Sequence, residues 1–270
     1  MPPSGRLFDH MTSKSEATYI DVRERILFGE LPAGSAFSAP ELMALTGVNQ
    51  TMAGRLLLSL KTGGYITRSG NSYVISSFTT QQVEEWGLAL GSIVEIGALR
   101  IALGGEARLK PLVTFLETHL RDIPIDHEDF FLGAMGLTRI VLGGEHSCLS
   151  QLVQQFIPQV FFRLLWMSDY YAPRTGFLVE SADRFVSAAR AGDLNAVRAA
   201  SRHFFDNIAP SLHTLVAKMG EGTYPPNVKK DGFHTIEAQI TGMPTYANAI
   251  RAASLAFTPL PDANLTAFRV

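Results

Sequence analysis

The most constraining feature of the chain is a helical pattern that ends in a glycine pair and runs directly into a hairpin. Four apolar residues between positions 49 and 62 recur at helical spacing and form one buried face: Ala53, Leu56, Leu57 and Leu60. Gly63-Gly64 ends this helix, because glycine adopts a left-handed C-cap at little cost. Two strand-like segments, 65–68 and 72–75, then flank the turn residues Ser69-Gly70-Asn71. The pattern predicts a helix followed by a β-hairpin.

Two shorter helices are predicted before this unit. The first covers 17–28 and ends at Gly29, shortly before Leu31-Pro32. The second runs to about residue 45, with Ser38 as its N-cap and Glu41 at the position that completes a capping box. Helix, helix, glycine-containing turn, helix and hairpin make a winged helix-turn-helix. We therefore expect residues 1–78 to form a DNA-binding domain.

The chain from 79 to 220 is helical almost throughout. An apolar stripe runs from Val83 to Ile101, and Gly104-Gly105 ends it. Further helices are predicted over 107–120, 126–142, 149–167, 176–191 and 194–219, the last with Pro210 as a break or kink. Antiparallel helices joined by short loops indicate an all-α bundle, so the whole chain is expected to be mainly α.

The last segment, 221–270, is rich in proline but too apolar for a free, solvated tail. Its apolar residues are Ile250, Leu255, Phe257, Leu260, Leu265 and Phe268. We expect this extension, whose role the sequence does not give, to pack on the body or on a partner subunit.

Composition narrows the class of protein. The 270 residues carry a formal net charge of −2 and a single cysteine, Cys148, which excludes an internal disulfide framework and a multi-cysteine zinc site. The start lacks a secretion signal, and no uninterrupted apolar run approaches the roughly 18 to 20 residues that span a bilayer. A cytoplasmic protein with no membrane segment is expected.

Two parts of the chain resemble a known family. The run RILFGELPAGSAFSAPELMALTGVNQTMAGRLLLSLKTGGYITRSGNSYVIS resembles the N-terminal domain of GntR-type bacterial transcription regulators. The helical part, with EIGALRIA at 95–102 and AARAGD at 188–193, resembles the ligand-sensing FCD domain of their FadR-like branch. The resemblance covers about 17–219. It implies a homodimer that binds double-stranded operator DNA, with a small organic effector, such as a carboxylic acid, held in the helical domain.

A recognition helix of this kind reads base edges in the major groove, while the wing reaches the minor groove or the backbone. The candidate DNA-binding residues are Ser38, Asn49, Gln50, Thr51, Arg55, Lys61, Arg68, Asn71 and Ser72. Family members usually begin this helix with Ser-Arg-Thr-Pro-Val-Arg, but here Gln50 and Gly54 replace the two arginines, and Pro40 replaces a third on the preceding helix. Arg55 lies one position later, about 100° around the helix.

The charge of this region leaves two hypotheses open. Seven Lys or Arg stand against six Asp or Glu up to residue 78, a net charge of about +1, which is weak for a domain that neutralises phosphates. Either the operator differs from the usual one, or DNA binding is weakened. In the second case the protein is a sensor or interaction protein with an impaired head.

In many FCD domains an Asp and three His residues bind a divalent metal, which holds a carboxylate ligand. The usual Asp-x-x-Phe-His reads HEDFF at 127–131 here, the middle histidine falls at Ala182 or Asp183, and only His203 keeps its place. His127, Asp183 and His203 remain a disfavoured metal set, and we expect no cofactor. The candidate effector-binding residues are His127, Phe131, Met135, Arg139, Asp183 and His203, with Arg139 as a carboxylate partner.

Enzymatic readings are not supported by any motif. His146 and Cys148 are two residues apart, a spacing that does not bring them together on a helix, and the sequence has no nucleophile elbow, phosphate loop or His-Glu-x-x-His motif. We expect the protein not to be an enzyme.

Overall fold

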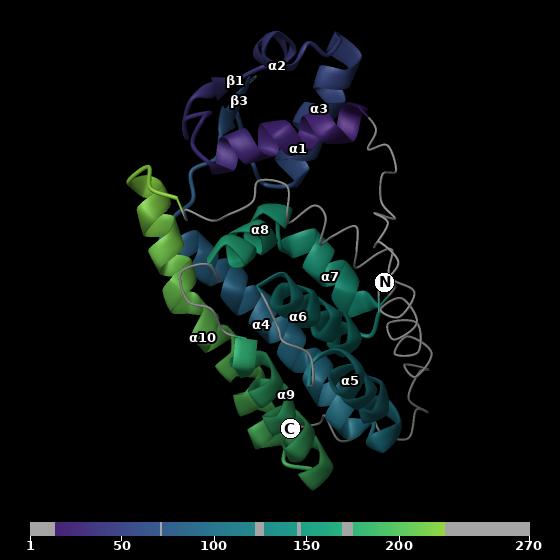
Figure 1. Cartoon of the computed structure of the whole chain (residues 1–270). Coiled ribbons are helices and arrows are strands. Elements are labelled where there is room, and N and C mark those ends of the chain that lie inside the picture. Colours follow the sequence, from purple (N-terminus) through teal and green to yellow (C-terminus); the bar gives the residue numbers. More distant parts are fainter. Residues whose placement is uncertain (1–13, 71, 122–126, 145–146, 169–174, 225–270) are drawn as a thin grey trace, which may run out of the picture. The chain divides into compact units, whose positions relative to one another are not determined.

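The computed structural model describes residues 14–70, 72–121, 127–144, 147–168 and 175–224 (Figure 1). The chain divides into two compact units. The first, here called the head, contains the residues up to Phe78 together with the short segments 158–160 and 218–224. The second, here called the helical unit, contains the rest of the described helices from Thr79 onward.

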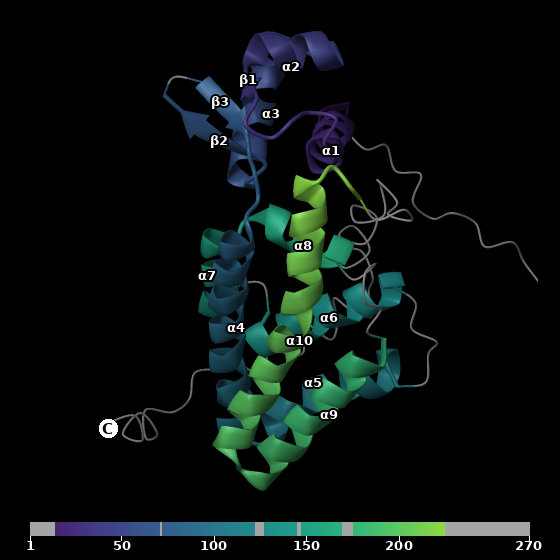
Figure 2. The same ribbon diagram turned by 90° about the vertical axis from the view of Figure 1, so that its left-hand side faces the viewer.

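The head has three helices and a small sheet. Its helices are α1 (Lys14–Leu27), α2 (Ala39–Thr46) and α3 (Gln50–Thr62), and its strands are β1 (Ala36–Phe37), β2 (Ile66–Ser69) and β3 (Ser72–Ile75). The sheet is antiparallel in the order β1-β3-β2, and Figure 2 shows the β2–β3 hairpin beside α3. The winged helix-turn-helix predicted from the sequence is confirmed. β1 was not predicted, because two residues are too short to show the alternation of a strand.

The connector between α2 and α3 shows why this sequence makes a tight turn. Ser38 N–H and Oγ both donate to Glu41 Oε2, at 2.6 and 2.8 Å, which secures the start of α2. Gly47 ends α2 with φ of +69°, a left-handed backbone that favours glycine, and its N–H donates to the Met43 carbonyl. The buried faces of α2 and α3, with Leu42 and the four apolar residues of α3, then close on each other.

The helical unit consists of seven helices within the described part of the chain, apart from the first residues of α8 and the last residues of α10, which belong to the head. The helices are α4 (Thr80–Leu103), α5 (Glu106–His119), α6 (His127–Leu142), α7 (Cys148–Phe156), α8 (Gln159–Ser168), α9 (Thr175–Ala191) and α10 (Leu194–Gly220). One core cluster joins apolar residues of α4, α5, α6, α9 and α10. The predicted all-α bundle and the mainly α class are confirmed. The extension from residue 225 lies outside the described residues.

Two helix predictions need correction. The single helix expected over 149–167 is two helices, because Pro158 has no N–H to donate and forces Ile157 into extended backbone (φ −103°, ψ 112°). Pro210 does not end α10, which continues to Gly220.

The helix α4 is long and mostly apolar, although Glu95 and Arg100 interrupt its apolar residues. By length and composition α4 is apolar enough to cross a bilayer. In the helical unit it packs against α5, α6, α7 and α9, as the central helix of a bundle does. Gly97 permits one of these contacts, since a Cβ there would lie 2.5 Å from the Val141 carbonyl oxygen on α6.

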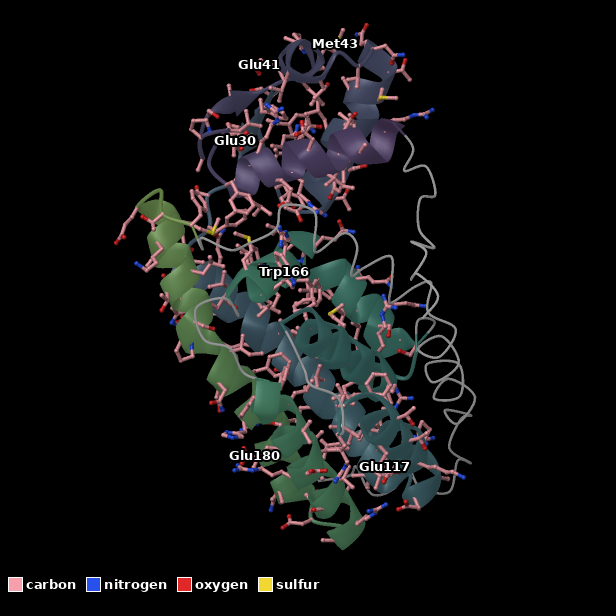
Figure 3. The ribbon with its side chains drawn as sticks, viewed as in Figure 1. Glu30, Glu41, Met43, Glu117, Trp166 and Glu180 are labelled. Atoms are coloured by element: carbon pink, nitrogen blue, oxygen red, sulfur yellow. The ribbon has the colours of Figure 1, made fainter. Side chains whose placement is uncertain are left out.

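Part of the bundle interior is built around a charged side chain. The Arg163 guanidinium stacks over the Trp166 ring at 4.1 Å, and both side chains are completely buried on α8. Figure 3 shows Trp166 among the side chains enclosed by these helices.

Candidate DNA-binding face and sensor cavities

The outer face of α3 is the part of the head most suited to reading DNA. Its apolar stripe is buried, which turns the remaining half of the helix circumference outward. Eight residues of α3 outside the stripe are exposed: Gln50, Thr51, Gly54, Arg55, Leu58, Ser59, Lys61 and Thr62. Four of them were predicted from the sequence.

Sequence reasoning missed the other four residues, among them Gly54 and Leu58. At about 100° per residue, Gln50, Gly54 and Leu58 form one ridge along α3. Leu58 is 59% exposed, and a Cβ on Gly54 would have nothing within 4 Å. The sequence does carry a signal for Gly54 and Leu58, because they lie four and eight residues after Gln50 and so fall on the same side of the helix.

The wing is held by hydrogen bonds to its own turn. Arg68 Nε donates to the Gly70 carbonyl at 3.0 Å, and Ser72 Oγ donates to the Ser69 carbonyl at 3.1 Å. Gly70 has φ of +60°, which a two-residue hairpin turn requires of it. Asn71 lies outside the described residues. The guanidinium of Arg68 is thereby kept at the exposed tip of the hairpin.

Two of the predicted DNA contacts are structural caps. Asn49 is the N-cap of α3 rather than its first residue, and its Oδ1 accepts from Met52 N–H at 2.9 Å. Ser38 is bound to Glu41, as described above. Their side chains fix the ends of α3 and α2, so neither is a freely available base-reading group.

Ion pairs reduce the positive charge that the head offers. Arg23 pairs with Glu24 at 2.9 Å in the core, and Arg25 pairs with Asp21 at 2.9 Å on α1. Among the described residues of the head, Arg55, Lys61 and Arg68 are exposed cations without an ion pair. All three lie on α3 or the wing.

The helical unit contains an apolar cavity of about 80 Å³ that is open on one side, here called cavity 1. It lies among α4, α5, α6, α9 and α10, and its lining includes Val94, Leu112, Leu137, Phe185 and Phe204. The described lining residues include three hydroxyl side chains, Thr138, Ser181 and Ser201, and none that is charged.

A second apolar cavity of about 50 Å³, here called cavity 2, lies next to it. The two share the lining residues Ala134, Thr138, Phe204 and Phe205. Phe131 and Met135, both predicted for the effector site, line cavity 2.

None of the other predicted effector residues whose side chains are described lines these two cavities. Arg139, Asp183 and His203 line neither cavity, and the side chain of His127 lies outside the described residues. The reason is helical rotation: Ala182 and Phe204 do line cavity 1, and the residue beside each points about 100° away.

A divalent metal does not fit the described residues. The Asp183 carboxylate is half exposed and paired with Arg121. The His203 ring packs edge-on against Phe177 at 5.1 Å, and its Nδ1 lies 3.2 Å from Asn207 Nδ2. Across the described segments no three His, Cys, Asp or Glu residues gather as a metal site would require.

A larger groove of about 490 Å³ runs along α4 and α10 on the surface of the helical unit. Its floor is apolar, and Phe205 covers Gly91, where a Cβ would lie 3.3 Å from the ring. Polar groups on its rim lie close to one another: Arg202 binds Glu95 at 3.0 Å, and His213 Nε2 lies 3.1 Å from a Glu84 carboxylate oxygen. The Arg202 guanidinium is therefore occupied by a carboxylate of the protein itself.

Comparison of the sequence with protein-family models and with curated proteins finds no match. Comparison of the fold does. The chain shares its fold with Lar, described as controlling the expression of the Listeria monocytogenes agr system. The TM-score is 0.57 at 16% identity, over 77% of this chain and 100% of Lar. Weaker similarities are to E. coli McbR/YncC (TM-score 0.46, 15% identity, 76% of this chain and 99% of that one) and to a GntR family member from Pseudomonas syringae pv. tomato (0.45, 15%, 77% and 88%).

Proposed function

We propose that the protein is a bacterial DNA-binding transcription regulator whose operator affinity is set by a small molecule in the helical unit. The observation that carries the proposal is the outer face of α3, where Gln50 and Thr51 stand exposed at the start of the helix beside Arg55. An amide pairs with adenine, and a guanidinium with guanine or phosphate, when such a helix enters the major groove. The fold shared with Lar, whose description gives it control of expression, supports the same function.

A homodimer is part of this proposal, because two heads bind a two-fold operator more tightly and more specifically than one. Its surface is the outward face of α4, where Leu88 is 72% exposed and Ile96 and Leu103 are also exposed. At about 100° per residue these three fall within roughly 80° of arc. Leu88 also lines the groove between α4 and α10, so the apolar surface continues into that groove.

The dimer surface is tested by placing charged residues on it. We expect Leu88→Glu combined with Ile96→Glu to give a monomer by light scattering, while the wild type is a dimer. Phe156→Glu, at an equally exposed apolar residue on α7, is the matched control and should leave the mass unchanged. A double variant that remains dimeric at micromolar concentration would place the interface elsewhere.

Regulation follows from a population shift. We expect two states of the dimer that differ in the arrangement of the two heads. An effector that binds one state more tightly than the other favours that state, and the change in operator affinity is limited by this difference in effector affinity. Cavities 1 and 2 are the proposed effector site. The long helices α4 and α10 both line them, so a ligand that shifts either helix there would move the whole length of that helix.

The test of the function is selection of genomic DNA fragments by the purified protein at two salt concentrations. A specific fragment whose affinity falls as salt rises supports the regulator and gives its operator. Arg55→Ala and Arg68→Ala should each weaken that binding, and unchanged affinity in both would show that these contacts are assigned wrongly.

The second candidate is a sensor or interaction protein with a weakened head. It is favoured by the net charge of about +1 up to residue 78 and by Gly54, which stands where the resemblance expects an arginine. Failure to retain any specific fragment, even at low salt, in a protein that is still dimeric would favour this candidate.

A further inference from the structure

We propose that cavities 1 and 2 together take one uncharged, largely apolar small molecule, whose single hydrogen-bonding group is seated at Ser181. This rests on the proposed function, in which the helical unit holds the effector, and it names the chemical class of that effector.

The shape of the site comes from two cavities with a common wall. Cavity 1 is about 80 Å³ and cavity 2 about 50 Å³, and Phe204 and Phe205 belong to the lining of both. Both residues are partly exposed, so a rotamer change of either ring would join the two cavities into one elongated space. An apolar cavity of about 150 Å³ binds benzene, so the joined space suits a molecule of that order of size.

The hydroxyl groups of the lining differ in what they already bind. Thr138 Oγ1 donates to the Ala134 carbonyl at 2.7 Å. Ser201 Oγ donates to the Val197 carbonyl at 3.0 Å. Both protons are therefore used within their own helices.

Ser181 is the exception. The residue is 6% exposed, and within the described part of the chain its Oγ makes no hydrogen bond. A buried hydroxyl without a partner carries an unpaid desolvation cost, so a ligand that supplies a donor or an acceptor there gains affinity. Ser181 therefore marks where the polar end of the ligand lies.

The same surroundings disfavour an anion. No described residue of either lining is charged. Three arginines of the helical unit are engaged elsewhere: Arg121 pairs with Asp183, and both Arg198 and Arg202 pair with Glu95. Transfer of an unpaired carboxylate into this space is far more costly than transfer of a neutral hydroxyl or carbonyl. The metal that would otherwise hold a carboxylate does not fit the described residues, so a neutral ligand is the class that this site selects.

The experiment uses three probes of equal size on the full chain: 1-hexanol, toluene and pentanoate, which have the same number of non-hydrogen atoms. Binding is measured by calorimetry or ligand-observed NMR in the absence of DNA. We expect saturable binding of 1-hexanol and toluene, and at least tenfold weaker binding of pentanoate, with or without added Zn²⁺.

Three variants locate the site. Ser181→Ala should weaken 1-hexanol about three- to tenfold, the range that one hydrogen bond gives, and leave toluene unchanged. Ala134→Leu, at a residue shared by both cavities, should abolish binding of both neutral probes. Ser187→Ala, on the exposed side of the same helix as Ser181, is the control and should change nothing.

Several results would overturn the proposal. They are absence of saturable 1-hexanol binding at millimolar concentration, pentanoate binding as tight as that of 1-hexanol, and Ser181→Ala with unchanged 1-hexanol affinity. Because no DNA is present, a head that binds no operator leaves the probe result intact. Specific operator binding together with a negative probe result would refute the ligand class alone.

Discussion

Substitutions at Gly54 distinguish the contribution of α3 to folding stability from its contribution to DNA binding. Gly54 lies in the middle of an exposed helical face, its φ is not in the left-handed region, and a Cβ there would meet nothing within 4 Å. Replacement by alanine therefore removes the entropic penalty of glycine without a clash. Gly54→Ala should raise the free energy of unfolding by about 0.8–1.0 kcal/mol, measured by denaturant titration.

Gly54→Arg also removes the entropic penalty of glycine in the helix, and it adds a cation to the proposed DNA-binding face. If each added arginine neutralises one phosphate, a dimer gains two contacts, and the slope of log K against log salt steepens by about 1.8 relative to Gly54→Ala. Between 50 and 200 mM salt this corresponds to roughly a tenfold greater loss of affinity. Fluorescence anisotropy on the selected fragment, over a series of KCl concentrations, measures the slope.

The matched control places the same charge elsewhere. Ser187→Arg adds an arginine to an exposed position of α9 and should leave the slope unchanged. Equal slopes for Gly54→Arg and Gly54→Ala would refute the reasoning, because they would mean that this face of α3 does not meet the phosphates. A loss of stability in Gly54→Ala would contradict the packing on which both variants rest.

Three further outcomes are expected. Asn49→Ala removes the N-cap of α3 and should cost about 1 kcal/mol in the free energy of unfolding of the head, seen by chemical denaturation; an unchanged midpoint would show that the cap is dispensable. Gly97→Ala should destabilise the helical unit by about 1–3 kcal/mol, because the added Cβ meets the Val141 backbone, and a neutral melting curve would contradict that close approach. If the exposed side chain of Leu58 contacts a thymine methyl, replacing thymine by uracil in the bound fragment should weaken binding of the wild type but not of Leu58→Ala. An equal loss of affinity in both proteins would exclude that contact.

The local patterns of the chain were sufficient for the architecture of the head. Helical spacing gave the buried stripe of α3, and the capping residues gave the start of α2, because both signals depend on neighbours within a few positions. Pro158 shows the limit of periodicity. The apolar pattern continues across it from α7 into α8, and only the missing N–H separates them into two helices.

Cavity residues were harder to predict than elements, since a cavity is made by several helices at once. Asp183 and His203 occupy the right helices, but each is one residue away from a lining position, which turns it away from the space. Phe131 and Met135 line cavity 2, while Ser181, which carries the unpaired hydroxyl, has no sequence signal that separates it from any other serine on α9.

By itself, then, the sequence determined the helices, the hairpin and the winged helix-turn-helix order, because hydrophobic spacing, caps and turn residues act locally along the chain. Within the described part of the chain, the tertiary structure decided that the Ser181 hydroxyl in the lining of cavity 1 lacks a partner, that Arg55 and Arg68 form no ion pair on the head, and which apolar face of α4 stays exposed. Those properties depend on side chains brought together from helices far apart in the sequence, and no local pattern records their pairing.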